Sequence, residues 1–213
     1  MHMKRVGPLW LAGPLVVLVV LVVLLLGGAQ FVTHTQARAA AAPKYQWDIL
    51  SVDFAAGTLN AGGIASALAN DGSKITLTGE GTFNTASHTG SANVTGGGTW
   101  QTFDPSGAPT ASGTYQVTSF VSFTQAPGDP PPLRDTIGIH ENIRGGLLVV
   151  TVQFSDESTG VLTVSCHLFG PSAPPSVFEG ITVSKGFTDY WNRQAPPAPP
   201  GNANRTNFHI LNP

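Results

Sequence analysis

The sequence has 213 residues and a formal net charge of −2, with 10% charged residues, 25 glycines and 17 prolines. After an N-terminal leader, this length allows one domain with its own hydrophobic core but is short for two. Beyond residue 39 the basic residues stand singly along the chain. Because no cluster of them could neutralise successive phosphates, the composition argues against nucleic acid as a partner.

Residues 1–39 are predicted to be a signal peptide, or an N-terminal membrane anchor, with a short spacer. Lys4 and Arg5 precede an uninterrupted apolar run at 15–26, and no further charge occurs before Arg38. A positive start followed by a hydrophobic helix is the pattern of a secretory signal.

Two fates of this segment stay open. The small residues Gly27, Ala29, Ala37 and Ala39 favour cleavage. Residues 9–29 also match the ~20 residues that a helix needs to cross the hydrocarbon core of a membrane. In both cases the basic end stays in the cytoplasm and the rest is exported, either secreted or anchored in the plasma membrane. The membrane is therefore a partner only through this segment.

Residues 40–213 form the predicted extracytoplasmic domain. Three of the ten basic residues precede it, which leaves seven against twelve acidic residues and a net charge of −5. Cys166 is the single cysteine and cannot form an internal disulfide, although export would place it in an oxidising compartment. Stability must then come from the core. This combination is typical of a bacterial envelope protein.

The domain is predicted to be all-β. From Tyr45 onwards Gly, Thr, Ser and Val dominate, and turn clusters recur between short apolar stretches. The pattern is typical of a single antiparallel β-barrel or a two-sheet sandwich, here of roughly 8–10 strands. The N-terminal hydrophobic export helix would precede it.

Several strands can be placed in chain order. Residues 64–68 lead into the turn N-D-G-S and 75–77 return from it, which predicts a hairpin. Residues 114–123 alternate over a long strand, and 208–211 form a closing strand that places the C-terminus in the sheet.

A short echo links three segments: G-T-F at Gly81–Phe83, G-T-W at Gly98–Trp100 and G-T-Y at Gly113–Tyr115. We interpret them as similar positions on successive strands, where each glycine relieves crowding and each aromatic ring fills the core. The spacing of G-T-W and G-T-Y resembles the meander of avidin-like barrels. No ligand-binding residue of that family has a counterpart here, so the resemblance implies nothing about function.

A further hairpin surrounds the turn S-D-E-S-T-G. Apolar residues occupy even positions from Leu148 to Phe154 and from Leu162 to Leu168. Pairing these two faces places Phe154 opposite Leu162. The other face is either solvated or lines a polar cavity, and it carries Thr151, Gln153, Thr163, Ser165 and His167.

Three proline-rich segments cannot enter central strands: Asp129–Pro132, Pro171–Pro175 and Ala195–Gly201. They are predicted to be loops at the ends of strands. Loops carried by a rigid scaffold often hold binding residues. We therefore expect these segments to contact a ligand or a partner.

Two residue pairs invite a chemical interpretation. His140 beside Glu141 could bind a metal or move protons, but no second histidine stands at a short ligand spacing. Cys166 and His167 could form a thiol and its base, but neighbours on a strand point in opposite directions. Cys166 is therefore expected to be a small buried hydrophobic residue.

The segment from Phe178 to Asn192 concentrates aromatic and charged residues. Aromatic rings beside polar groups suit a carbohydrate, or another polar ligand with an apolar face. The alternative is that Phe187 and Trp191 fill the core at the end of a strand. Together with the polar face, this segment supplies the candidate ligand-binding residues Asp189, Tyr190, Trp191, His167 and Gln153.

No catalytic motif is present, and Asp104, Asp156 and Glu157 are better explained as turn residues than as paired carboxylates. We expect a non-enzymatic, ligand-binding or surface-interaction domain without a cofactor, which contacts a small molecule, a carbohydrate or a surface protein. One alternative is an extracytoplasmic hydrolase or isomerase, in which His140, Glu141 and His167 would have to converge in a cleft. The other is a structural envelope protein.

Overall fold

Residues 42–85, 91–194 and 204–212 are described by the structure, which is a computed structural model. The predicted export helix, its cleavage positions and the loop at 195–201 lie outside these residues. In the part of the chain that is described, no helix is long and apolar enough to span a membrane. This part is all-β, with fourteen strands and two short 3-10 turns, η1 (Ser91–Asn93) and η2 (His140–Asn142).

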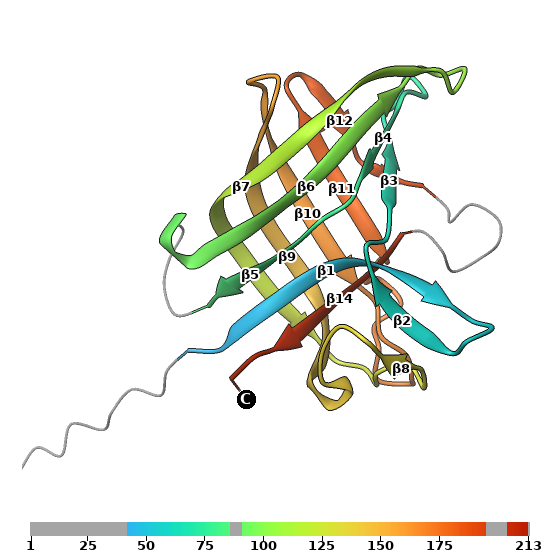
Figure 1. Cartoon of the computed structure of the whole chain (residues 1–213), viewed down its shortest axis with the longest axis vertical. Helices are drawn as coiled ribbons and strands as arrows, with labels where there is room; N and C mark the ends of the chain where they lie inside the picture. Colours follow the sequence, from blue (N-terminus) through green and yellow to red (C-terminus); the bar gives the residue numbers. More distant parts are fainter. Residues whose placement is uncertain (1–41, 86–90, 195–203, 213) are drawn as a thin grey trace, which may run out of the picture. The chain divides into compact units, whose positions relative to one another are not determined.

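Six antiparallel strands close into a barrel, in the order β1, β5, β6, β7, β9, β14 and back to β1 (Figure 1). The barrel alternative of the prediction is therefore confirmed, although the strands outnumber the expected eight to ten. The bounds are β1 (Lys44–Asp53), β5 (Glu80–Asn84), β6 (Val94–Phe103), β7 (Pro109–Ala126), β9 (Ile143–Phe154) and β14 (Arg205–Ile210).

The other eight described strands extend this barrel. The strand β10 pairs with β9 and continues to β11 and β12, while β4 pairs with β6 and continues to β3 and β13. The strand β2 pairs with β1 and, in parallel, with β8. The bounds are β2 (Thr58–Ala61), β3 (Ala65–Leu68), β4 (Lys74–Leu77), β8 (Arg134–Asp135), β10 (Thr159–Cys166), β11 (Gly180–Lys185), β12 (Thr188–Tyr190) and β13 (Asn192–Arg193).

Residues 127–142, which connect β7 to β9, are called the covering segment below. They contain β8 and η2, and the pairing of β8 with β2 holds them beside β1. This parallel pair joins residues that are about 76 positions apart, with Thr58 opposite Arg134.

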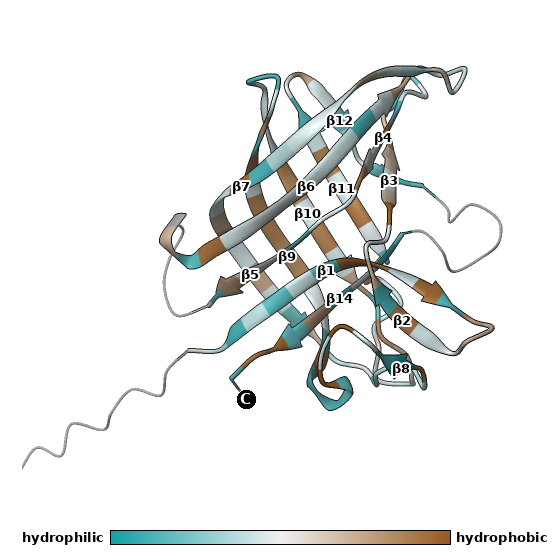
Figure 2. Ribbon diagram, viewed as in Figure 1, coloured by the Kyte–Doolittle hydropathy of each residue, from teal (hydrophilic) through white to brown (hydrophobic). Residues whose placement is uncertain are grey.

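The barrel interior is filled by apolar side chains. In Figure 2, hydrophobic residues form brown bands along the ribbons of β9 and of the adjoining β10 and β11. An aromatic cluster lies at its centre: the ring of Phe123 is 4.8 Å from that of Phe83, 4.9 Å from that of Tyr45 and 5.0 Å from that of Phe208. Rings at such separations add attraction beyond the area that they bury.

The echo of G-T-aromatic segments lies on β5, β6 and β7, and its interpretation is confirmed. Across the β6–β7 pair, Gly98 faces Tyr115 and Gly113 faces Trp100, so a glycine lies opposite each of these two rings. On β5, a Cβ added to Gly81 would lie 2.7 Å from the ring nitrogen of Trp47. Trp47 is fully buried, so this contact leaves room only for glycine.

The β9–β10 hairpin forms, but its predicted register is wrong by four residues. Leu162 pairs with Val150, and Phe154 instead begins a tight turn in which its N–H donates to the Ser158 carbonyl over 2.8 Å. Glu157 adopts the left-handed conformation in this turn, with φ 69°. An even shift keeps the same residues on each face, so the assignment of the apolar face is right.

The polar face of this hairpin points away from the barrel interior. Gln153 and His167 are exposed, whereas Ser165 is buried. The solvated alternative therefore holds for Gln153, while His167, although exposed, also lines a cavity. The β3–β4 hairpin and the closing strand β14 are also confirmed.

Candidate functional site

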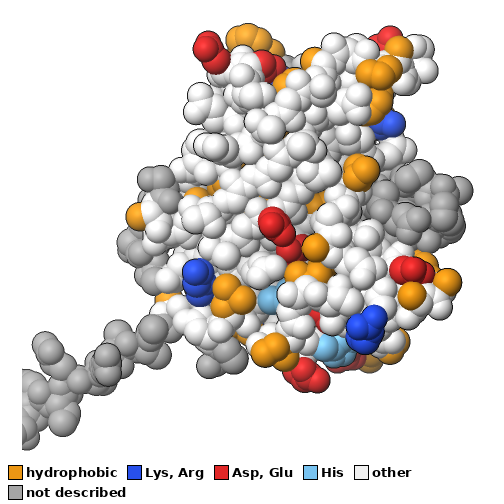
Figure 3. Space-filling model, in the orientation of Figure 1, with side chains coloured by type: hydrophobic (Ala, Val, Ile, Leu, Met, Phe, Trp, Pro, Cys, Tyr) orange, Lys and Arg blue, Asp and Glu red, His pale blue; other side chains and the backbone are white. Residues whose placement is uncertain are grey.

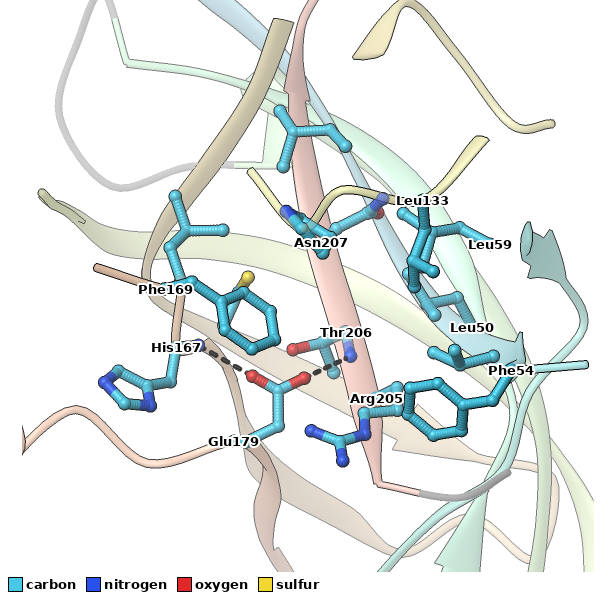
Figure 4. A pocket seen from close by; sticks show the side chains of 15 residues that line it. Leu50, Phe54, Leu59, Leu133, His167, Phe169, Glu179, Arg205, Thr206 and Asn207 are labelled. Atoms are coloured by element: carbon cyan, nitrogen blue, oxygen red, sulfur yellow. Dashed lines mark hydrogen bonds between the residues drawn. The ribbon is translucent and has the colours of Figure 1, made fainter. Parts of the chain in front are cut away.

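A cavity of about 70 Å³ lies beside β14, between the end of β10 and the covering segment (Figure 4). Most of its wall is apolar, and three charged or amide side chains interrupt it. The lining residues are Leu50, Val52, Phe54, Leu59, Pro131, Leu133, Ile143, Cys166, His167, Leu168, Phe169, Glu179, Arg205, Thr206 and Asn207.

The polar groups come to this pocket because β14 is covered on both faces. Alternate residues of a strand point to opposite sides, so Asn207 and His209 lie opposite Phe208, which belongs to the aromatic cluster. The covering segment buries this second side: Asn207 is 3% exposed and His209 is 2% exposed. Both faces of β14 are therefore buried, although one of them carries polar side chains.

The amide of Asn207 has no hydrogen-bond partner among the described residues, at either Oδ1 or Nδ2. Its cross-strand neighbour Asp48 is already engaged, because Gln46 Nε2 donates to both of its carboxylate oxygens over 3.1 Å. A buried amide without a partner costs about 1–3 kcal/mol. Trp47 Nε1 and Ser165 Oγ are also buried without a partner, but neither residue lines the pocket.

Arg205 contributes a second unpartnered donor to the pocket. Its Nε is buried and has no acceptor in the described part of the chain. Arg205 precedes Asn207 by two positions on β14, so both side chains leave the same face of the strand.

Glu179 is held on the other side of the pocket by two backbone groups. His167 N–H donates to its Oε2 over 2.7 Å, and Thr206 N–H donates to its Oε1 over 2.8 Å (Figure 4). Burial raises the pKa of Glu179 to about 7, although these two donors and the Arg205 charge act in the opposite direction. The carboxyl therefore exchanges its proton near neutral pH.

His209 connects β14 to the covering segment. Its Nε2 lies 2.5 Å from Asp135 Oδ2, and its Nδ1 lies 3.9 Å from Asp48 Oδ2. Asp135 Oδ1 accepts the N–H groups of Ile137 and Gly138. Gly138 is required here, because an added Cβ would lie 2.8 Å from His209 Cδ2.

Hydrogen bonds and nearby charges together outweigh the effect of burial on the pKa values of this pair. Burial alone would lower the pKa of His209, but the carboxylates of Asp48 and Asp135 outweigh it and raise the pKa above its ordinary value. Burial alone would raise the pKa of Asp135, yet the donors of Ile137, His209 and Gly138 lower it. Both shifts favour the charged forms, so the buried contact between His209 and Asp135 is strongest where both groups are charged, and it holds the covering segment against β14.

Of the predicted ligand-binding residues, His167 lines the pocket. Gln153 is exposed on the outer face of β9, and Asp189 is exposed on β12. Tyr190 is buried in the core at 6% exposure, whereas Trp191 is 67% exposed. The alternative that Phe187 and Trp191 fill the core is wrong, because the Phe187 side chain at the β11–β12 turn is fully exposed.

The weak catalytic candidates lie elsewhere. His140 and Glu141 belong to η2, and neither lines the pocket. His140 Nε2 is bonded to the Pro131 carbonyl over 2.8 Å, and Glu141 is exposed. Within the described ranges, no group of three or more His, Cys, Asp or Glu residues is arranged to hold a metal ion.

Cys166 is 3% exposed and belongs to the apolar row, as the sequence predicts. Burial, and to a lesser extent the Glu179 charge, raises the pKa of its thiol well above the ordinary value. The exposed His167 points to the other face. Cys166 is therefore not an activated nucleophile.

The polar side chains of this region were not predicted from the sequence. Glu179, Arg205 and Asn207 line the pocket, and His209 contacts Asp48 and Asp135 beside it. The alternation in R-T-N-F-H-I predicts a polar face on β14, and that signal was available. It does not reveal burial, because the cover comes from residues 127–142, far away in the sequence.

The face shown in Figure 3 carries charged side chains singly rather than in a patch.

Comparison with protein-family models, with curated proteins and with solved structures found no match for this chain.

Proposed function

We propose that the chain is an exported β-barrel protein that binds a small molecule with an apolar body in the pocket beside β14. The unpartnered, buried amide of Asn207 in an otherwise apolar wall carries this proposal. Ligand sites in proteins combine such walls with a few convergent polar groups. The proposal of export is supported by the basic residues and the apolar run at the N-terminus. The proposal of binding is also supported by Pro131, a residue of a proline-rich loop that contributes to the pocket wall.

Methyl NMR of the full-length chain in mild detergent tests this proposal, with isobutyramide and isobutanol as the added probes. The methyl signals of Leu50, Leu59 and Leu133 should shift, since these residues line the pocket. Those of Leu148 and Leu162, which are fully buried in the barrel core, should stay in place. Pocket methyl signals that do not respond to either probe would contradict the proposal.

A filled pocket provides the matched control. Leu133→Trp adds an indole to the pocket wall and should abolish the shifts at Leu50 and Leu59. Val161→Trp places the same ring at a position that is 43% exposed on β10, and it should leave the shifts unchanged. Equal shifts in the two variants would mean that the probes bind elsewhere.

A further inference from the structure

The pocket has a distinct polar edge. The amide of Asn207 presents an acceptor, Oδ1, and a donor, Nδ2, side by side in one plane, and both lack a partner among the described residues. The complement of this edge is a planar group that also carries a donor beside an acceptor. A ketone or an ester supplies the acceptor alone, and a carboxylate supplies two acceptors.

The charges around this edge favour a neutral group. Asp48 is the cross-strand neighbour of Asn207, so an anion bound to the amide would lie close to a buried carboxylate. Arg205 leaves the same face of β14 two residues away, so a cation would meet a guanidinium there. That guanidinium would attract an anion, but Glu179 lines the same pocket and already interacts with it, so a bound anion would also meet the Glu179 carboxyl. Like charges at such sites are costly because the surroundings screen them poorly.

The rest of the pocket sets the size and shape of the ligand. A space of about 70 Å³ corresponds to the liquid volume of roughly two water molecules. Leu50, Leu59 and Leu133 surround it, which suits a short branched aliphatic group. Phe54 and Phe169 also line the pocket while being 59% and 56% exposed, so a longer ligand would continue over these two rings.

From this arrangement we infer that the ligand is a small neutral carboxamide or lactam with a branched aliphatic body, held by a pair of hydrogen bonds to Asn207. This inference rests on the proposed function and specifies its ligand class. Figure 4 shows Asn207 near Leu133, so one end of the bound group meets the amide while its body meets the leucines.

Three probes of matched shape test the inference: isobutyramide, 3-methyl-2-butanone and isobutyrate. Dissociation constants are measured on the full-length chain at pH 7.5 from the shifts of the pocket methyl signals. Isobutyramide should bind about tenfold more tightly than the ketone, because the ketone leaves Asn207 Oδ1 without a donor. It should also bind more tightly than isobutyrate.

The Asn207→Leu variant should reduce the amide-to-ketone ratio to about one, since it removes the donor and the acceptor together. Asn192→Leu, at an exposed asparagine on β13, should retain the tenfold ratio. Equal binding of ketone and amide in the unchanged protein, or tightest binding of isobutyrate, would overturn the carboxamide inference and leave the pocket as a binding site. Pocket methyl signals that respond to none of the probes would overturn both.

Discussion

The two faces of β14 are both buried, but by different chemistry. On the inner face, Phe208 is fully buried among aromatic rings. On the outer face, Asn207 and His209 are almost as deeply buried, at 3% and 2% exposure, beneath the covering segment. Adjacent residues of one strand therefore experience two different environments.

The difference separates stability from recognition. Apolar side chains inside the barrel stabilise the fold by leaving water, with about 25 cal/mol for each Å² buried. The polar groups outside it lower stability unless a partner satisfies them. His209 has such a partner in Asp135, while Asn207 has none among the described residues. We attribute the His209 side chain to positioning the covering segment, and we propose that the Asn207 amide binds the ligand.

The largest effect is expected inside the barrel. Phe83 is 1% exposed and its ring lies 5.2 Å from Tyr45 and 5.8 Å from Phe120. Phe83→Ala should lower the free energy of unfolding by about 3–5 kcal/mol, measured by denaturant titration. Phe187→Ala, at a fully exposed ring, should change it by less than about 0.5 kcal/mol. Similar losses in the two variants would break the distinction between core and surface.

The strands around the barrel core, and the turns between them, are also the features that the sequence predicts well. Alternation identified the apolar faces of β9 and β10, and Asp104 and Asp156 indeed form turns by accepting bonds from Ser106 and Ser158. These patterns are local, so they can be recognised in the sequence without knowledge of the fold. The register was wrong because the tight turn after Phe154 is set by backbone conformation rather than by hydrophobicity.

The site, in contrast, could be predicted only in small part. Glu179 and Asn207 reach one pocket because β14 closes the barrel, and Leu133 reaches it because β8 pairs with β2 in parallel. Neither event leaves a signal near these residues in the sequence. The candidates chosen from local composition, such as Trp191 and Asp189, are exposed instead.

A smaller effect is expected from pH, through the pair of His209 and Asp135. The pKa of His209 is raised by folding, so its contribution to stability is complete below its ordinary pKa and is lost as pH rises through the raised value. The lowered pKa of Asp135 gives a contribution that is lost as pH falls through that value. The free energy of unfolding should therefore be largest at pH values between the lowered pKa of Asp135 and the raised pKa of His209.

The measurement is the free energy of unfolding from pH 2 to pH 9 in a Glu179→Gln background. That background is needed because the raised pKa of Glu179 also lowers stability as pH rises. Asp135→Asn should lower stability by about 1–3 kcal/mol near pH 6 and flatten the decline above it. An unchanged pH profile in this variant would show that the pair does not hold the covering segment.

The most direct test of the central claim compares two buried asparagines near the start of β14. Asn204 is partnered, because its Oδ1 accepts the Ser66 N–H over 2.6 Å, and its left-handed backbone, with φ 55°, adds a second constraint. Asn207 has neither feature among the described residues.

Without ligand, Asn207→Leu should leave the free energy of unfolding unchanged or raise it by up to about 1 kcal/mol, whereas Asn204→Leu should lower it by more than about 2 kcal/mol. With saturating isobutyramide, the unchanged protein should gain stability and Asn207→Leu should gain little. If Asn207→Leu is instead as destabilising as Asn204→Leu, then the Asn207 amide serves the fold, and the account of this pocket is wrong.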